Sequence, residues 1–205
     1  MATATAERRS QADRRDEAEQ RLLAAAVQLV AERGLDRITL ADVGIAAGYS
    51  RGLPAHYFGG KDGLVVTLAA HLIDGFGRAL DRADHHEPGL RRLLGTVAFY
   101  FDSARKDPIR TRALFVLLGE GLSNELIRVQ IAELNARSAK GAEANLRAAI
   151  KAGEARADLD ARSMGVLILG GLRGAVGQWL LAPDEIDLAA VRDAFVGALT
   201  RSLTP

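Results

Sequence analysis

One stretch of the chain decides the fold. Residues 39–61 read TLADVGIAAGYSRGLPAHYFGGK, a run of helix-forming residues interrupted by Gly48. Thr39, followed three positions later by Asp42, resembles the capping box that starts a helix, and Gly48 would end that helix. Ser50 then offers the N-cap of a second helix. The stretch therefore predicts two short helices joined by a glycine turn.

Small residues stand where these two helices would cross. Gly44 and Ala47 would let the two backbones approach closely, while Val43 together with Ile45 or Ala46 would complete the buried side. Two short helices packed on a longer first helix form the unit whose last helix enters the major groove of DNA. The pattern therefore predicts a helix-turn-helix.

Helical periodicity runs through the rest of the chain. Before the stretch, one helix face carries Leu22, Leu23, Ala26, Val27 and Val30, and Gly34 would cap its end. After it, a helix would begin at Lys61 and fray at the glycines at 75 and 77, and a loop would follow at 84–89. Helical spacing then recurs over 90–101, after Asp107-Pro108, over 123–152, over 164–180 and over 188–199. Since no segment alternates with period two, we predict an all-α fold of about nine helices and no strand.

Composition excludes some classes of function. The chain has 205 residues, is 48% hydrophobic and contains no cysteine, so disulfides and thiolate metal sites are ruled out. Residues 1–20 show no apolar signal segment, and we expect a cytoplasmic protein. The net charge is +1, and residues 1–62 hold nine basic and nine acidic residues, so DNA binding would depend on where a few charges stand.

One apolar segment is long enough to raise the question of a membrane. Residues 164–181 are apolar over most of a bilayer-spanning length, but Arg173 stands in the middle and Gln178 follows it. A central arginine costs about 2.5–3.5 kcal/mol on insertion scales. We therefore expect a buried helix and no membrane partner.

Four motifs stand in order within residues 22–68: AERG at 31–34, TLADV at 39–43, AGYSRG at 47–52 and YFGGK at 57–61. Through these motifs the segment resembles the N-terminal domain of TetR-type transcriptional regulators. This resemblance implies a helix-turn-helix DNA-binding domain over residues 1–62. The charges Arg8, Arg9, Arg14 and Arg15 could form a flexible arm that reaches DNA, and the alternative is a disordered tail in which acidic residues are interspersed. Residues 63–205 would then form a helical effector-binding and dimerisation domain. The implied function is a repressor that a small molecule releases from operator DNA.

The resemblance also implies roles for single residues. Thr39 and Lys61 would contact phosphates, and Ser50 would start the recognition helix. Base and backbone contacts would come from Arg51, Gly52, Leu53, His56 and Tyr57. The chain departs from the family at three positions: Tyr49 replaces the usual valine, Pro54 replaces leucine, and Ala55 replaces a DNA-contacting tyrosine. Pro54 would remove a backbone donor about one turn into the helix.

The rest of the chain would bind a ligand and a second subunit. The segment 153–160 resembles the turn before the family's last two helices, which pair between subunits. Independently, Gly170 and Gly174 stand one turn apart and allow close helix approach, so we expect a homodimer through those helices. Aromatic residues on several helices, Phe101 among them, could surround an apolar or aromatic effector, and Asp102 is a candidate polar anchor beside Arg173 and Gln178. The candidate ligand-binding residues are Phe99, Tyr100, Phe115, Arg173, Gln178 and Trp179.

Two alternatives from other classes stay open. Asp81, Asp84, His85 and His86 cluster closely enough to suggest metal ligands of a helical enzyme, although the segment is expected to be a loop and adjacent histidines point apart on a helix. The other alternative is an all-α dimer that acts through protein contacts without DNA. Because the chain has neither a nucleophile motif nor a phosphate loop, we predict no enzyme, no cofactor, no catalytic residue and no metal.

Overall fold

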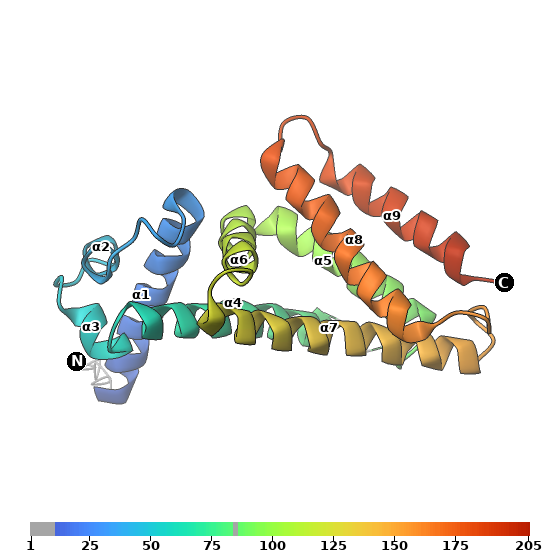
Figure 1. The fold of residues 1–205 in the computed structure, drawn as a ribbon, viewed down its shortest axis with the longest axis horizontal. Coiled ribbons are helices and arrows are strands. Elements are labelled where there is room, and N and C mark those ends of the chain that lie inside the picture. The colour runs from blue at the N-terminus through green and yellow to red at the C-terminus, as the bar shows by residue number, and fades with distance from the viewer. Residues whose placement is uncertain (1–10, 84–85) are drawn as a thin grey trace, which may run out of the picture. The chain divides into compact units, whose positions relative to one another are not determined.

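A computed structural model describes residues 11–83 and 86–205 (Figure 1). Across these two ranges the chain forms helices and no strand, which confirms the all-α prediction. The helices are α1 (Gln11–Arg33), α2 (Leu40–Ala46), α3 (Leu53–Phe58), α4 (Lys61–Ala83), α5 (Leu90–Lys106), α6 (Pro108–Glu120), α7 (Glu125–Lys151), α8 (Ala161–Leu181) and α9 (Leu188–Leu203). Arg8 and Arg9 of the predicted arm lie outside the described residues, whereas Arg14 and Arg15 lie in α1.

The chain divides into two compact units, residues 1–68 and residues 69–205. Helix α4 begins in the first unit and ends in the second. In the first unit, α1 buries the apolar face that the periodicity predicted: Leu22, Ala26 and Val30 are fully buried. Gly34 then ends α1 with φ of 78°, a left-handed backbone that favours glycine.

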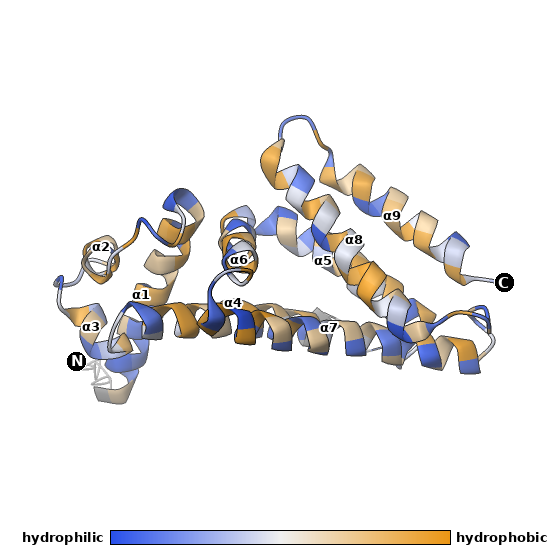
Figure 2. Ribbon diagram, in the orientation of Figure 1, coloured by the Kyte–Doolittle hydropathy of each residue, from blue (hydrophilic) through white to orange (hydrophobic). Residues whose placement is uncertain are grey.

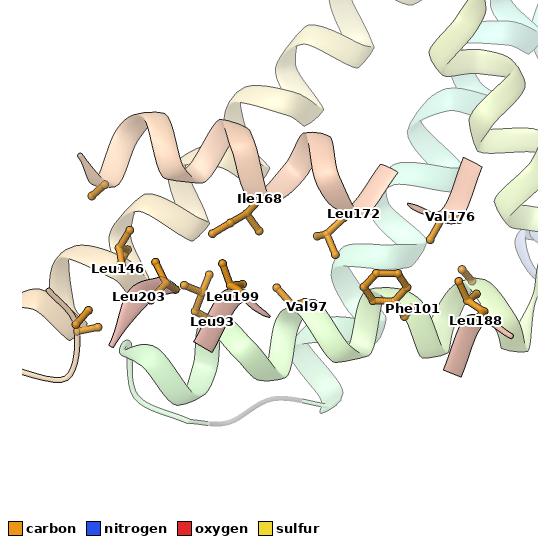
Figure 3. Packing of buried hydrophobic residues seen from close by; sticks show 14 of the residues in the cluster. Leu93, Val97, Phe101, Leu146, Ile168, Leu172, Val176, Leu188, Leu199 and Leu203 are labelled. Atoms are coloured by element: carbon orange, nitrogen blue, oxygen red, sulfur yellow. The ribbon is translucent and has the colours of Figure 1, made fainter. Parts of the chain in front are cut away.

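The second unit is built around α5, α7, α8 and α9. Figure 3 shows side chains of α5, α8 and α9 pointing toward one another in a single cluster. Phe101 of α5, Val176 of α8 and Leu203 of α9 are almost or completely inaccessible to solvent. Helix α7 packs along α8, and Leu146 joins the same cluster from α7. These helices together bury the apolar stripes that the sequence showed separately.

Helix α4 corrects the prediction that a helix would fray at Gly75 and Gly77, since it continues through both. The reason lies on α6. The Nη2 atom of Arg110 donates to the carbonyl oxygens of His71 at 2.7 Å and Leu72 at 3.2 Å. A Cβ at Gly75 would lie 2.0 Å from that atom, so the missing side chain makes room for the guanidinium.

Local capping sets other helix ends. Asp107 caps α6, because its side chain accepts from the backbone N–H of Arg110 at 3.0 Å, with Pro108 as the first helical residue, as predicted. Helix α7 begins at Glu125, slightly later than expected, because the Asn124 side chain accepts from two backbone N–H groups. In the predicted loop, residues 86–89 are not helical, and Asp84 and His85 lie outside the described residues.

Two helical segments, Lys61–Leu80 and Ala161–Leu181, are long and apolar enough to cross a membrane by length and composition alone. A core helix of a globular protein meets the same test, so this is weak evidence for a span. Figure 2 shows hydrophobic residues along α8 interrupted by hydrophilic ones. One of these interruptions is Arg173, whose side chain is partly buried within the second unit.

Candidate DNA-binding and ligand-binding sites

The capping box at the start of α2 forms as predicted, even though Asp stands in the position usually held by Glu or Gln. The backbone N–H of Asp42 donates to the Thr39 hydroxyl at 3.2 Å, and the backbone N–H of Thr39 donates to the Asp42 carboxylate at 2.9 Å. The Thr39 hydroxyl also donates to that carboxylate at 2.6 Å. These hydrogen bonds hold the pKa of Asp42 below its usual 3.8. Thr39 is therefore fixed and exposed at the helix start.

The turn between α2 and α3 depends on two glycines. Gly48 has φ of 78°, the left-handed conformation that lets the chain reverse after α2. Gly44 is buried where the segments cross. A Cβ there would lie 2.5 Å from the carbonyl oxygen of Ser50 and 3.2 Å from the Pro54 ring. The small-residue prediction for Gly44 is confirmed, and Pro54 serves as a packing partner of that glycine.

The buried face of α2 differs from the expected one. Val43 is fully buried, but Ile45 is 54% exposed and Ala46 is exposed as well. The prediction that Ile45 or Ala46 would complete the buried side is therefore wrong. Helix α2 has only seven residues, so Val43 and Gly44 alone form its inner face.

Helix α3 begins later than predicted. Ser50 does not cap it; the N-cap is Gly52, and no side chain bonds there. The Ser50 carbonyl instead accepts from the backbone N–H of Leu53 at 3.2 Å. Pro54 consequently stands in the first helical turn, where its missing N–H costs no intrahelical bond. Arg51 and Gly52 lie in the turn before α3 and not in its first turn, which corrects the expectation.

Most of the predicted DNA-contacting residues lie on the surface of the first unit. Leu53 and Tyr57 are partly buried, and the Tyr57 ring meets the His56 ring edge to face, with centroids 5.9 Å apart. Phe58 is buried, as expected for a core residue. The exposed candidates are Thr39, Ser50, Arg51, Gly52, His56 and Lys61. Their hydroxyls, backbone amide and cationic groups are donors that suit phosphate oxygens and base edges.

Lys61 stands at the first position of α4. Its Nζ donates to the backbone carbonyl of Asp36 at 3.2 Å, which ties the start of α4 to the loop after α1 within the first unit. An ammonium group has three donors, so two remain for other acceptors. The favourable interaction of the helix dipole with anions at this end would assist a phosphate held there.

A cavity of 370 Å³ lies within the second unit. Its lining comes from α4, α5, α7 and α8, together with Leu114 of α6. Two of the candidate ligand residues, Tyr100 and Arg173, line it. A neighbouring cavity of 490 Å³ shares Tyr100 and adds Phe99. The structure therefore brings these three candidate ligand residues to adjoining spaces.

The other candidates lie elsewhere. Trp179 belongs to the packed core, and Gln178 is exposed on α8. Phe115 shares a separate, more open hollow with Arg173. Sequence reasoning missed the polar residues that α5 and α7 bring to the 370 Å³ cavity, among them Arg92, Arg137 and Asn145. Their spacing on solvent-facing helix positions gave no signal that a cavity would form beside them.

Arg173 and Tyr100 influence each other in this cavity. Burial lowers the pKa of the Arg173 guanidinium, and its hydrogen bond with Tyr100 opposes that change. Burial likewise raises the pKa of the Tyr100 phenol. Arginine stays protonated in proteins, and a raised phenol pKa keeps the Tyr100 hydroxyl neutral at neutral pH.

Among residues 11–83 and 86–205 no three His, Cys, Asp or Glu side chains gather as a metal site. Of the four metal-ligand candidates in the enzyme alternative, Asp84 and His85 lie outside these ranges, and His86 is exposed just before α5. The cluster therefore gains no support from the part of the chain that is described.

The first unit's helices and exposed donors define a helix-turn-helix protein. Residues 22–68 match the family model for bacterial regulatory proteins of the tetR family. The probable HTH-type transcriptional regulator ArpR of Pseudomonas putida is 30% identical over 178 residues, covering 82% of this chain and 82% of that protein. The HTH-type transcriptional regulator TtgR, also from Pseudomonas putida, matches with the same identity and coverage. The chain therefore belongs to the TetR family, and its predicted class, a DNA-binding transcriptional regulator, is confirmed.

Solved structures share the fold over nearly the whole chain. A transcriptional regulator from Saccharomonospora viridis in complex with choline has a TM-score of 0.83 at 18% identity, covering 93% of this chain and 99% of that one. The regulator FadR from Bacillus subtilis in complex with stearoyl-CoA has a TM-score of 0.74 at 20% identity, covering 90% and 98%. The SmeT–triclosan complex has a TM-score of 0.77 at 17% identity, covering 92% of each.

Proposed function

We propose that this regulator is a homodimeric repressor that binds operator DNA through residues 1–62 and leaves it when a small molecule occupies residues 63–205. The observation that carries the proposal is the pairing of an exposed helix-turn-helix surface with a cavity in the second unit of the same chain. Three regulators of this fold were solved with choline, stearoyl-CoA or triclosan, which supports a small-molecule effector.

In this proposal Thr39 and Lys61 bind phosphates and fix the register on the duplex. Arg51, in the turn before α3, reads a guanine edge, and Leu53 and His56 contact bases or backbone beside it. Gly52 supports this role, since nothing lies within 4 Å of a Cβ placed there and the backbone is open to close approach. Tyr57 donates to phosphate from the exposed part of its ring.

Helices α8 and α9 form the dimer interface in this proposal. Exposed apolar residues on α8 support it: Val166 is 60% exposed, Leu167 is 65% exposed and Leu181 is 84% exposed. Gly170 and Gly174 are exposed on the same helix, with open space beside them. A second copy would cover this surface, because soluble monomers rarely leave such a row uncovered.

Helix α4 couples the two events. It carries Lys61 at its start and contributes Leu72, Ile73, Phe76 and Leu80 to the cavity lining. A ligand that moves these residues would move the start of the same helix. Recognition helices in a dimer must sit about 34–36 Å apart to reach successive turns of the groove, so a small displacement prevents simultaneous docking.

Selection of bound fragments from the host genome tests the proposal. We expect enrichment of fragments that share a short inverted repeat. Arg51→Ala should reduce preference among sequences, and Lys61→Ala should weaken binding to all duplexes while lowering the salt dependence by about one counterion. Arg105→Ala, an exposed arginine on α5, is the charge-matched control. Equal retention of genomic and random duplexes would refute DNA-based regulation and favour the protein-interaction alternative.

We also propose that the protein acts in the cytoplasm and works by binding and not by catalysis. In this proposal it needs neither a cofactor nor a membrane. The bacterial regulators related to it support this assignment. Stoichiometric zinc or iron in purified protein, measured by elemental analysis, would instead favour the enzyme alternative.

A further inference from the structure

The lining of the 370 Å³ cavity carries cationic side chains. Three arginines line it, Arg92, Arg137 and Arg173, and none of the described lining residues is Asp or Glu. Arg92 donates to the backbone carbonyl of His86 at 3.1 Å, and Arg137 is exposed. Arg173 is the informative one, because it projects from the middle of α8 and is partly buried.

Arg173 has neutral hydrogen-bond partners. Its Nη1 donates to the Asn135 side-chain oxygen at 2.6 Å, and its guanidinium also bonds the Tyr100 hydroxyl. Its Nε–H is buried and has no acceptor within the described part of the chain. Among those residues, only Tyr100 contributes appreciably to its electrostatic environment. The partly buried cation thus has no anionic partner among the described residues.

A guanidinium keeps its charge in proteins, so desolvating it without an anionic partner is unfavourable. Arginine can bind a carboxylate by two parallel N–H···O bonds. We infer that the ligand of this cavity is an amphiphilic anion whose carboxylate pairs with Arg173 and whose saturated chain occupies the apolar lining. This inference rests on the proposed function, since it takes the cavity as the effector site.

The remaining lining suits a hydrocarbon chain. Most of it is aliphatic and comes from several helices: Leu72 and Ile73 of α4, Leu93 and Val97 of α5, and Ile168 and Leu172 of α8. The volume of 370 Å³ lies near the lower end of the roughly 300–1,000 Å³ typical of ligand pockets. A single medium-length chain therefore suits it better than a large ring system.

Two close relatives of such a ligand should bind more weakly because of their charge. A quaternary ammonium of the same chain length would place a cation beside Arg173 with no described carboxylate to offset it. A neutral alcohol would fill the apolar lining equally well but would leave the guanidinium without a counter-ion. The head group, rather than the chain, should therefore decide affinity.

Calorimetric titration of the full-length protein without DNA tests this directly. The probes are octanoate, decanoate and dodecanoate, each compared with the alcohol and the trimethylammonium compound of the same chain. The variants are Arg173→Met, which keeps an apolar stem of similar length, Arg173→Lys, which keeps the charge but not the planar edge, and the control Arg105→Met on the exposed surface of α5.

We expect at least one carboxylate to bind the wild type about tenfold or more tightly than its alcohol. Arg173→Met should remove that preference while leaving alcohol binding unchanged, Arg173→Lys should restore part of it, and Arg105→Met should have no effect. Circular dichroism of each variant, with its alcohol affinity, shows that the cavity is intact. Equal binding of alcohol and carboxylate to the wild type, tighter binding of the ammonium compound, or no binding by any probe would each overturn the inference.

Failure here is separable from failure of the proposed function. A wild-type protein that selects genomic DNA but prefers no carboxylate remains a regulator with a different effector. A protein that binds carboxylates through Arg173 but selects no DNA would support the cavity assignment and refute the regulatory role.

Discussion

The two units of the chain place their cations differently. In the first unit, Arg51 and Lys61 are exposed, and Lys61 donates one hydrogen bond to the backbone carbonyl of Asp36. In the second unit, Arg173 is partly buried with neutral partners. Exposed, separated cations suit a long polyanion that water and salt also reach, whereas a desolvated guanidinium suits one small anion. The position of a charge therefore indicates its partner better than the net charge of +1 does.

The largest expected difference between the units comes from their cores. Phe101 of α5 is 1% exposed and contacts the Phe195 ring at a centroid distance of 5.6 Å. Phe101→Ala should lower the free energy of unfolding of the second unit by about 3–5 kcal/mol, because it removes a buried ring and leaves a cavity. Hydrogen exchange should show lost protection in α5 and α9, with α2 and α3 unaffected. Equal loss of protection in α2 would mean that the two units unfold together.

A tight backbone crossing in the first unit gives the next largest effect. Gly44→Ala would place a Cβ 2.5 Å from the Ser50 carbonyl oxygen, which is backbone and cannot swing away. We expect a loss of about 1–3 kcal/mol in stability, as for overpacking, together with weaker operator binding. Gly52→Ala is the control, since no atom lies within 4 Å of its Cβ. Thermal melts of both variants decide the matter, and a Gly44→Ala protein as stable as the control would contradict the crossing.

The capping box is a smaller contributor. Thr39→Ala should destabilise the first unit by about 1 kcal/mol at neutral pH, while Thr39→Ser should cost little because it keeps the hydroxyl. Since the pKa of Asp42 is lowered below 3.8 by its bonds to Thr39, its contribution is present above that value and is lost as pH falls through the lower folded-state pKa. The difference between wild type and Thr39→Ala should therefore shrink in acid. Urea unfolding at several pH values measures it, and a constant difference would argue against the carboxylate's part.

The smallest effect concerns His71 in the second unit. Burial lowers the pKa of His71 below 6.5, and the positive charges of Arg110 and Arg78 lower it further, against the opposing effect of Asp74. Its contribution to stability is therefore present above 6.5 and is lost as pH falls through the lower folded-state pKa. His71→Gln should flatten the pH dependence of stability in this window. Identical pH profiles for wild type and His71→Gln would remove this role.

Sequence-based prediction worked where the deciding residues are close together along the chain. Gly34, the Thr39–Asp42 box and Asp107-Pro108 act within one turn, so their patterns predicted the observed ends. Ser50 was a poor guide because packing of Pro54 on Gly44 moves the start of α3 to Leu53. Helix α2 has only seven residues, which is too short for hydrophobic periodicity to show on which face Ile45 lies.

Residues brought together from distant helices were harder to predict. Tyr100 and Arg173 line the 370 Å³ cavity, whereas Trp179 packs into the core and Gln178 is exposed on the same helix. Asn135 of α7, which accepts from Arg173, gave no signal in the sequence. Such contacts depend on how α7 packs along α8, which periodicity alone does not define.

Gly75 and Arg110 constrain each other's replacement. In isolation, alanine at position 75 would strengthen α4 by about 1 kcal/mol, the usual advantage of alanine over glycine inside a helix. With Arg110 present, the same methyl group would displace the guanidinium and break its hydrogen bonds to the carbonyl oxygens of His71 and Leu72. The order of substitution thus matters during divergence: replacement of the arginine first makes alanine at 75 favourable, whereas alanine first breaks the bond between α6 and α4.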